Sequence, residues 1–423
     1  MFTVCFLSSV MRCQPLSRAL TVSRSKMVIS QNVICAICAS EYFVRIGVGY
    51  DSYQKHSFDC LECLQPIGVA VRAKAPNAHI EVVENCTFVD IDDSKTVINL
   101  HPNCCFPVDK YHERMSFPSL QAVNLIARHV RAVPGKFQDI ATQFDIPNAA
   151  NLWNKVKAIV NLSESEGKEK HIDKLIVGYN KERKKHKFGG CECKSANDVL
   201  NEFFDSLYYP RVNDISKPIL GIIDSLFEQG KLDDFYKYYS DNLKKENQNR
   251  YISTLTSFFR YRDILGQLVD RARIWNEDVD DMMVGSKNFD EIKLYYGEVY
   301  EALTSNFTVF ACLNNLHADR QFDEFKQMTL AKYIKDVEKA KRDNPFKDTA
   351  EFAAFSEQLD SSLRNGSHHA SIWRDGEVVM FKSGGTGAER NISYSRYLHM
   401  CNVVTISLVA LYMIELHMVE KYS

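Results

Sequence analysis

The spacing of apolar residues separates a β-rich N-terminal part of the chain from a helical remainder. Up to about residue 115, the apolar residues form short β-branched runs between turn residues, a pattern that predicts strands. These runs lie at 43–48, 67–71, 79–83 and 88–91. The second run follows Pro66, and proline suits the first residue of a strand. We therefore expect a small β module over residues 27–115.

After Pro118 the apolar residues recur every three or four positions, which predicts helices. A polar and basic stretch at about 163–195 interrupts this pattern and predicts a helix end followed by an exposed linker. We place a domain boundary there, so that a helical segment with its basic linker covers 116–194. Amphipathic helices are predicted almost throughout the following middle region, 195–285.

The last segment, 286–423, has the pattern of a self-contained helical bundle. Helices are predicted at about 289–314, 320–343, 348–366 and 395–418. Helices of these lengths suit an up-down four-helix bundle. Residues 372–381, with the turn pair Asp375-Gly376, predict a β-hairpin inserted before the last helix. The expected fold class is therefore mainly α, with a small β-rich N-terminal module and a β-hairpin insertion in the C-terminal bundle.

Two stretches need a separate interpretation. Residues 1–26 contain four basic residues and no acidic residue. This composition is typical of an organellar transit peptide, or it belongs to an extension upstream of a true start at Met27; in neither case is it part of the fold. The apolar run at 402–414 is shorter than the roughly 20 residues that span a bilayer. We expect it to form a buried helix, and we expect no membrane association.

The net charge limits what the surface can bind. The 423 residues carry a formal net charge of −2, which argues against a uniformly basic coat for nucleic acid. Any RNA contact must therefore come from a local patch, and the basic run at 181–187 is one candidate. The alternative is that this run is the solvated face of a linker.

Four of the 13 cysteines form two C-x2-C pairs, Cys35-x2-Cys38 and Cys60-x2-Cys63, separated by 21 residues. This spacing matches the tetrathiolate sites of zinc ribbons. Residues 43–50 are long enough to form a hairpin that brings the pairs together. We predict a structural zinc ion in a reducing compartment, and hence a cytoplasmic protein. The alternative is that these are reduced, buried thiols that serve as small hydrophobes.

A second group of candidate metal ligands follows the first. It comprises Cys86, His101, Cys104 and Cys105, with His112 as a further candidate. The spacing of these residues is irregular and matches no common metal motif. Whether they bind a second metal stays open at this point.

The candidate catalytic residues lie at the end of the predicted 348–366 helix, in the arrangement Arg364-Asn365-x3-His369. A guanidinium can neutralise a phosphate group with two hydrogen bonds, and an imidazole can exchange a proton near neutral pH. Together they suit phosphodiester cleavage without a catalytic metal. The alternative is that both side chains only cap the helix, where positive charge complements the helix dipole. His368 is ambiguous, and the spacing favours His369.

With the bundle and the hairpin around it, this arrangement resembles the HEPN superfamily, whose small helical bundles carry an R-x4-6-H motif. The resemblance covers about 286–423. It implies an endoribonuclease in which the 2′-hydroxyl of the RNA attacks the neighbouring phosphate and leaves a cyclic phosphate. It also implies that His369 moves the proton, that Arg364 stabilises charge on the phosphoryl group, and that Asn365 orients one of them or the RNA. Relatives often pair two motifs across a homodimer, and many act in phage defence or toxin-like stress responses.

A second class of function competes with this one. A bundle that dimerises but does not cut would leave a zinc-containing adaptor that binds nucleic acid or protein. The sequence contains no P-loop, dinucleotide fingerprint, H-E-x-x-H helix or G-x-S-x-G elbow, which argues against nucleotide hydrolysis, metalloprotease and esterase activities. We therefore expect RNA and a second copy of the chain as partners.

Overall fold

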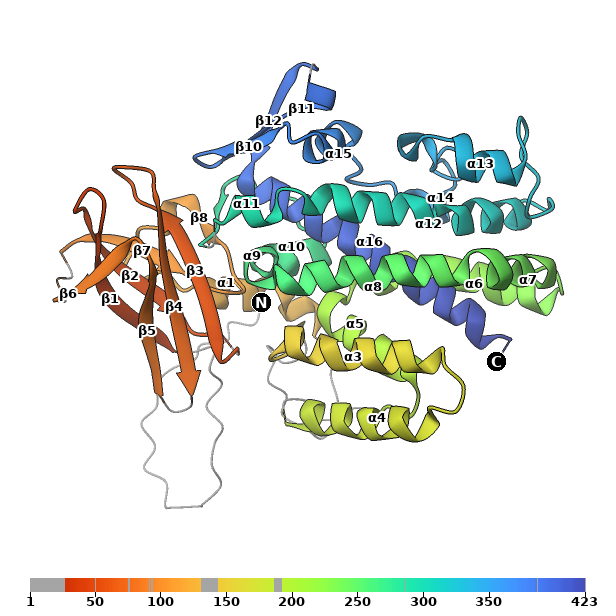
Figure 1. The fold of residues 1–423 in the computed structure, drawn as a ribbon, viewed down its shortest axis with the longest axis horizontal. Helices are drawn as coiled ribbons and strands as arrows, with labels where there is room; N and C mark the ends of the chain where they lie inside the picture. Colours follow the sequence, from red (N-terminus) through yellow and green to blue (C-terminus); the bar gives the residue numbers. More distant parts are fainter. Residues whose placement is uncertain are drawn as a thin grey trace, which may run out of the picture.

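The computed structural model describes residues 27–422 except for 50, 75–76, 91, 93, 131–143, 186–191, 286 and 386. A β module lies at one end of the molecule and a helical body at the other (Figure 1). The predicted extension 1–26 lies outside the described residues, as do the last two residues of the basic run 181–187.

The β module consists of two sheets that share one hydrophobic core. The four-stranded sheet has the order β6-β1-β2-β7, with β1 Val28–Cys35, β2 Glu41–Gly47, β6 Cys86–Val89 and β7 Thr96–Leu100. The three-stranded sheet has the order β3-β4-β5, with β3 Tyr53–Asp59, β4 Pro66–Lys74 and β5 Asn77–Glu84. All pairs are antiparallel except β2 with β7. The four predicted strands are confirmed as β2, β4, β5 and β6.

The sequence pattern missed β3 because two of its inward positions are polar. Gln54, His56 and Phe58 alternate with more exposed neighbours, and all three are buried. The expected hairpin at 43–50 is wrong, because residues 43–47 belong to a single strand, β2. The next strand, β3, lies in the other sheet.

The helical body contains one long run of helices and a small third sheet. Its first helices are α1 Pro118–Ile126, α3 Ala149–Ser163, α4 Glu169–Lys184, α5 Ala196–Tyr208, α6 Arg211–Glu228, α7 Asp233–Asn242, α8 Lys244–Arg260, α9 Arg262–Leu265 and α10 Val269–Arg273. The later helices are α11 Phe289–Ile292, α12 Tyr295–His317, α13 Leu330–Asp336, α14 Ala350–Ala353, α15 Ser361–His368 and α16 Tyr394–Glu420. The third sheet has the order β10-β11-β12, with β10 Ile372–Asp375, β11 Val378–Lys382 and β12 Glu389–Ser393.

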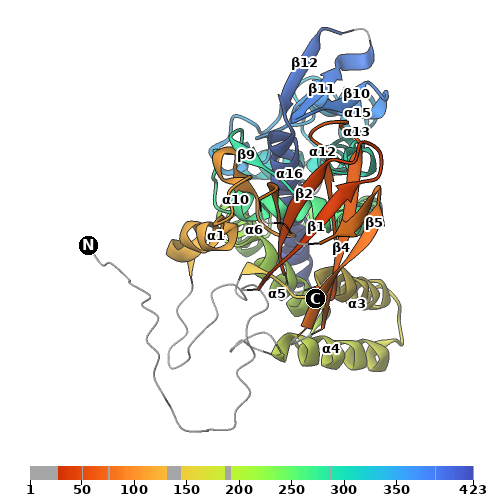
Figure 2. The ribbon, with the colours of Figure 1, turned by 90° about the vertical axis from the view of Figure 1, so that its left-hand side faces the viewer.

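One hydrophobic core runs through the helical body. Buried residues from Ile146 to Met418 belong to a single cluster, so the predicted boundaries near 194 and 286 do not separate two cores. Helix α16 crosses the middle of the body in both views (Figures 1 and 2) and packs on α6 and α12. The helices that surround α16 therefore come from both the middle region and the C-terminal segment.

The predicted linker at 163–195 contains a helix. The 16 residues of α4 occupy about half of it, and α4 packs against α3. Ile176 and Tyr179 are buried on one face of α4, and Arg183 is buried and paired with Glu202. The sequence pattern did not predict this buried face, because α4 is rich in charged residues and only four of its residues are buried.

The C-terminal four-helix bundle is also corrected in part. The first and last helices, α12 and α16, and the hairpin β10–β11 match the prediction, and Gly376 has a φ of 56° at the predicted turn. The expected helix at 320–343 is reduced to α13, because Leu330 and Tyr333 are the only buried hydrophobic residues in that range. The expected helix at 348–366 is broken by Gln358, whose φ of 58° is left-handed. Helices α6 and α8 supply the long partners that these segments lack.

The apolar run at 402–414 lies within α16, as predicted. Helix α16 has the length and composition to cross a membrane, but 94% of its most apolar stretch is buried inside the body. Burial on all sides accounts for its composition, because a core helix is apolar around its whole circumference.

Candidate functional site

Each C-x2-C pair lies in the turn of its own hairpin. Cys35 and Cys38 belong to the turn between β1 and β2, and Cys60 and Cys63 belong to the turn between β3 and β4. The backbone of the two turns is closed in the same way. The N–H of the first cysteine in each turn donates across it at 2.9 Å, to Ser40 in one case and Gln65 in the other.

Both turns contain a residue with left-handed backbone directly after the second cysteine. Ala39 has a φ of 61° and Leu64 has a φ of 60°. Non-glycine residues rarely adopt this conformation. Its occurrence at equivalent places shows that the two turns are built alike, each directing two thiols to the same side.

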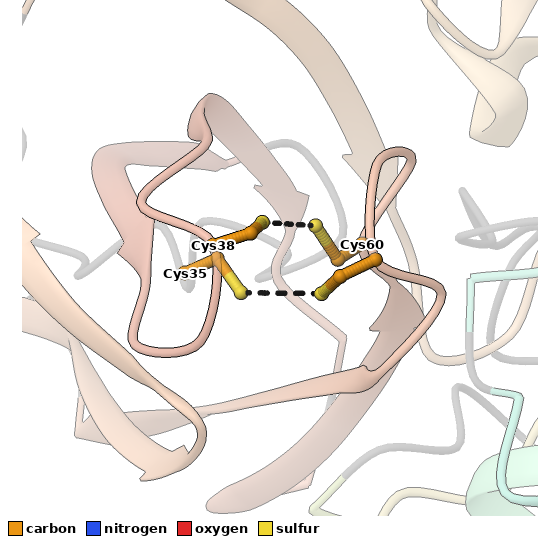
Figure 3. Close-up of side chains that lie close together, drawn as sticks. Cys35, Cys38 and Cys60 are labelled. Carbon is orange, nitrogen blue, oxygen red and sulfur yellow. Dashed lines mark hydrogen bonds between the residues drawn. The ribbon is translucent and has the colours of Figure 1, made fainter.

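The four sulfur atoms meet in one cluster (Figure 3). The Sγ atoms of Cys35 and Cys63 are 3.7 Å apart, those of Cys38 and Cys60 are 3.4 Å apart, and all four lie within 4.8 Å of one another. A disulfide needs about 2.05 Å. Four thiolates at about 2.3 Å from a tetrahedral metal lie about 3.8 Å from one another. The donor set therefore fits a metal ion such as zinc.

A second layer of donors supports the thiolates. The hydroxyl of Tyr42 lies 3.1 Å from Cys60 Sγ and accepts a hydrogen bond from the N–H of Leu61 at 2.9 Å. Burial acts to raise the pKa of the Cys60 thiol, but the N–H groups of Cys63 and Glu62 and the Tyr42 hydroxyl outweigh it and lower this pKa to about 6. Such donors orient metal ligands and favour their charged form.

The second predicted group of ligands does not come together. The Cys86 thiol donates to the carbonyl of Gly68 at 3.6 Å, and Nδ1 of His101 accepts from the N–H of Asn103 at 3.1 Å. Nδ1 of His112 lies 2.7 Å from the carbonyl oxygen of Val97. Cys104 and Cys105 are both buried. Within the part of the chain that the structure describes, only the four-cysteine cluster brings three or more such ligands into coordinating range.

Two of the three candidate catalytic residues, Arg364 and Asn365, lie on α15, a helix of eight residues, and His369 directly follows it. Asp360 begins this helix, because its carboxylate accepts from the N–H groups of Ser362 at 2.7 Å and Leu363 at 3.0 Å. Residues Arg364 and Asn365 follow in the middle of the helix. The third sheet packs behind them, with Phe381 against Gly366. The sequence Asp360-Ser-Ser-Leu is itself an N-cap signal that marks the break in the predicted longer helix.

Arg364 is hydrogen-bonded on two sides. Its Nε donates to Glu301 Oε1 on α12 at 2.6 Å, and Nη2 contacts the same oxygen. Its Nη1 donates to Oδ1 of Asn365 at 2.7 Å, and Asn365 donates to Ser383 at 3.3 Å. The Arg364 side chain is 29% exposed, so the guanidinium reaches solvent. Asn365 therefore orients Arg364 directly, and Glu301 is a partner that no spacing in the sequence indicates.

The two histidines at the end of α15 take different positions. His368 is one helical turn after Arg364 and lies on the same face of the helix. A Cβ built on Gly297 of α12 would be 3.1 Å from His368 Nε2, so this ring lies over the turn of α12 that precedes Glu301. His369 follows the last helical residue, and its N–H donates to the carbonyl of Asn365 at 3.0 Å. Its exposed side chain lies about 140° around the helix from Arg364.

The basic run at 181–187 does not form a free cationic patch in its described part. Arg183 is buried against Glu202 at 2.9 Å, Lys184 pairs with Glu192 at 3.1 Å, and Lys185 pairs with Glu182 at 2.9 Å. These carboxylates neutralise the charge that a phosphate would need.

An ion pair connects the metal-binding cluster to the sheet behind α15. Arg374 of β10 donates two hydrogen bonds to Asp59, at 2.7 and 2.9 Å, and Asp59 directly precedes Cys60. The two side chains are only 15% and 19% exposed. The hairpin that follows the tandem histidines is thereby joined to the second cysteine turn.

Comparisons of the chain with family models, with curated proteins and with solved structures find no match. Assignment of a function therefore depends on the chemistry of the chain's own residues.

Proposed function

We propose that the protein is an endoribonuclease of HEPN type, in which the C-terminal helices carry the cleavage site and the four-cysteine cluster holds a structural zinc ion. In this proposal the 2′-hydroxyl of the RNA attacks the adjacent phosphate, and the bond to the 5′-oxygen of the next nucleotide breaks. A 2′,3′-cyclic phosphate and a free 5′-hydroxyl result, and no catalytic metal is required.

One observation carries the proposal. The Arg364 guanidinium, held by the Asn365 amide, and the His368 imidazole one helical turn further on both extend from α15 to the same stretch of α12, and the Arg364 side chain is partly exposed. The guanidinium would stabilise the charge that develops on the phosphoryl oxygens. An imidazole would take the proton from the 2′-hydroxyl or deliver one to the leaving oxygen. These are the two functions that cleavage by the RNA's own hydroxyl requires.

The tandem histidines give two versions of the mechanism. The motif spacing favours His369, whereas the shared face with Arg364 favours His368. Single substitutions distinguish them: His368→Ala abolishes cleavage in one version, and His369→Ala does so in the other. The resemblance implies a homodimer, which would contain two copies of this face. Such a dimer would let His368 and His369 act on different RNA strands or in the sites of different subunits.

One observation favours the competing adaptor function. Arg364 already has a carboxylate partner in Glu301, and a purely structural arginine would be held in this way. An incoming phosphate must displace or share that carboxylate. In the adaptor version the bundle binds RNA or protein without cutting, and a role in phage defence or stress response would then depend on binding alone.

Purified zinc-loaded protein incubated with single-stranded RNA in a chelator of free Mg²⁺ separates the two functions. The nuclease proposal expects products with cyclic phosphate ends, lost in Arg364→Ala and in one of the two histidine variants. Equal cleavage by wild type and all variants would indicate a contaminant, and no cleavage by any of them would favour the adaptor.

A further inference from the structure

Helix α12 exposes one narrow stripe next to the proposed cleavage site. Most of this helix is buried, but Glu298, Glu301 and Ser305 are half-buried on the same side. Glu298 accepts a hydrogen bond from Ser257 of α8 at 2.8 Å, and Glu301 and Ser305 continue the stripe one turn apart. Helix α12 runs between α8 on one side and α15 and α13 on the other (Figure 1). Side chains from these neighbours therefore converge on the stripe.

Four cations surround the stripe, and we call them the basic strip: Arg250, Lys339, Arg342 and Arg364. Arg364 contacts Glu301, and Lys339 Nζ donates to the hydroxyl of Ser305. Arg342 donates to the carbonyl of Ser305 at 3.4 Å. Arg250 of α8 donates to Oδ1 of Asn306, the next residue of α12, at 3.1 Å.

The basic strip has more positive than negative charge. Glu301 and Glu246 are the carboxylates that pair with it, through Arg364 and Arg250. Among the described residues, neither Lys339 nor Arg342 has a carboxylate within salt-bridge distance. Arg342 is only 6% exposed and donates to backbone carbonyls, including that of Val337 at 3.3 Å.

The surroundings of Lys339 disfavour the charged form of its amine. Its burial, and then the neighbouring charge of Arg342, lower the pKa of the amine to about 8, and Glu301 only partly offsets them. The charges of Arg250 and Arg364 act on the same amine and in the same direction. A half-buried cluster in which cations outnumber carboxylates is stabilised by an anion from solution.

Resting on the proposed function, we propose that Lys339 and Arg250 bind the phosphate that neighbours the one contacted by Arg364, and that the buried Arg342 adds positive charge behind them. A single-stranded RNA backbone would then lie along α12. Ser305 is four residues beyond Glu301, a rise of about 6 Å along the helix, which is comparable to the separation of adjacent phosphates in an extended strand. Cationic tracks of this kind are how proteins follow a single strand without reading its sequence.

The test is binding of a fluorescent RNA oligonucleotide with 2′-O-methyl groups throughout, which cannot be cut by its own hydroxyl. Affinity is measured by anisotropy at several salt concentrations for wild type, Lys339→Gln and Arg250→Gln. We expect each variant to bind about 3–10-fold more weakly, with the slope of log affinity against log salt reduced by about 0.7 per lost contact. Lys335→Gln, on the neighbouring α13 and exposed, is the matched control and should bind as wild type does.

Cleavage assays with a short and a long RNA distinguish failure of this inference from failure of the proposed function. A dinucleotide has only one phosphate, so Lys339→Gln should lose much less of its kcat/KM on a dinucleotide than on a longer strand, where its KM should rise. If Lys339→Gln and Arg250→Gln bind RNA more weakly but neither they nor the wild type cleave it, the RNA-binding role of the basic strip is supported and the proposed nuclease activity is contradicted. Cleavage with unchanged binding and KM in Lys339→Gln and Arg250→Gln would overturn the strip.

Discussion

The four-cysteine cluster and the end of α15 show two different relations between local sequence and chemistry. In the cluster, each pair of ligands is set by a short turn that closes with its own backbone hydrogen bonds. At the end of α15, the groups that decide the chemistry come from distant elements, with Glu301 and Gly297 on α12 and Ser383 after β11. A spacing rule is therefore sufficient for the first site and insufficient for the second.

The two regions also differ in how many explanations their geometry permits. Four sulfur atoms within 4.8 Å of one another, too far apart for disulfides, fit a bound metal and little else. An arginine paired with a glutamate fits both a catalytic cation waiting for a phosphate and a structural ion pair. The following predictions test that contrast, beginning with the largest effect.

Removing one thiolate should have the largest effect. We expect wild type to bind one zinc ion per chain and Cys60→Ser to bind none, with the β module destabilised by on the order of 10 kcal/mol. Metal analysis together with thermal unfolding measures both changes. Cys86→Ala is the control, since Cys86 lies opposite Cys35 on β6 but outside the cluster, and it should keep the metal. Full zinc content in Cys60→Ser would contradict the assignment.

Substitutions that distinguish the charge of Arg364 from its structural role should have the next largest effect. Arg364→Ala should lower the cleavage rate by about 10²–10³-fold, as expected for loss of a group that stabilises developing charge. Glu301→Gln breaks the same ion pair but keeps the cation, so it should retain cleavage while losing at most about 1 kcal/mol of stability. Single-turnover rates and unfolding curves measure the two quantities. If both variants lose cleavage equally, Arg364 acts by holding the structure.

A buried carboxyl elsewhere in the body affects how any pH profile is interpreted. Glu415 of α16 is buried and accepts hydrogen bonds from Tyr251 at 2.6 Å, Tyr239 at 2.8 Å and Asn247 at 3.0 Å. Burial outweighs these donors and raises the pKa of Glu415 to about 7. As pH rises, Glu415 therefore loses its proton in the unfolded chain before it does so in the folded protein. The free energy of unfolding then falls between about pH 4.5 and 7, by up to about 3 kcal/mol.

Glu415→Gln should flatten this pH dependence of stability while leaving the pH profile of cleavage unchanged. Thermal unfolding at pH 5 and pH 8 measures the first quantity, and initial rates over the same range measure the second. A cleavage profile that flattens along with stability would mean that the apparent titration belongs to the fold and not to a histidine.

The smallest effect concerns the link between the two regions. Asp59 and Arg374 join the second cysteine turn to the hairpin behind α15. Because the pair is mostly buried and makes two hydrogen bonds, a double-mutant cycle with Asp59→Ala and Arg374→Ala should give a coupling energy of about 1–2 kcal/mol. Additive effects of the two substitutions would show that the regions are energetically independent.

The chain's pattern predicted some parts of this molecule well, for identifiable physical reasons. The four clustered cysteines were found because their spacing encodes local turns, and α16 was found because a core helix is continuously apolar. Strand β3 was missed because polar side chains occupy two of its buried positions. The helix at 348–366 was predicted too long, because Gln358 interrupts it with a left-handed backbone conformation. A glutamine does not indicate this conformation in a sequence as strongly as a glycine does.

The site at α15 was predicted only in part. Arg364 and Asn365 lie together, as their adjacency suggested, but the ion pair with Glu301 spans 63 positions of sequence. Helix α15 also continues to His368, beyond the predicted end at 366, which places His368 on the face of Arg364 and leaves His369 after the last helical residue. Such relations depend on how α12 and α15 pack, which a single motif does not encode.

The central claim is that the RNA's own 2′-hydroxyl cuts the strand at Arg364 and a neighbouring imidazole. Its most direct test is single-turnover cleavage of a short RNA and of the same strand with one 2′-deoxy nucleotide at the cut position. The account predicts cyclic phosphate ends from the RNA, no cutting of the 2′-deoxy strand at that position, and no cutting of either by Arg364→Ala. Equal cutting of both strands, or products with 5′-phosphate ends, would contradict it.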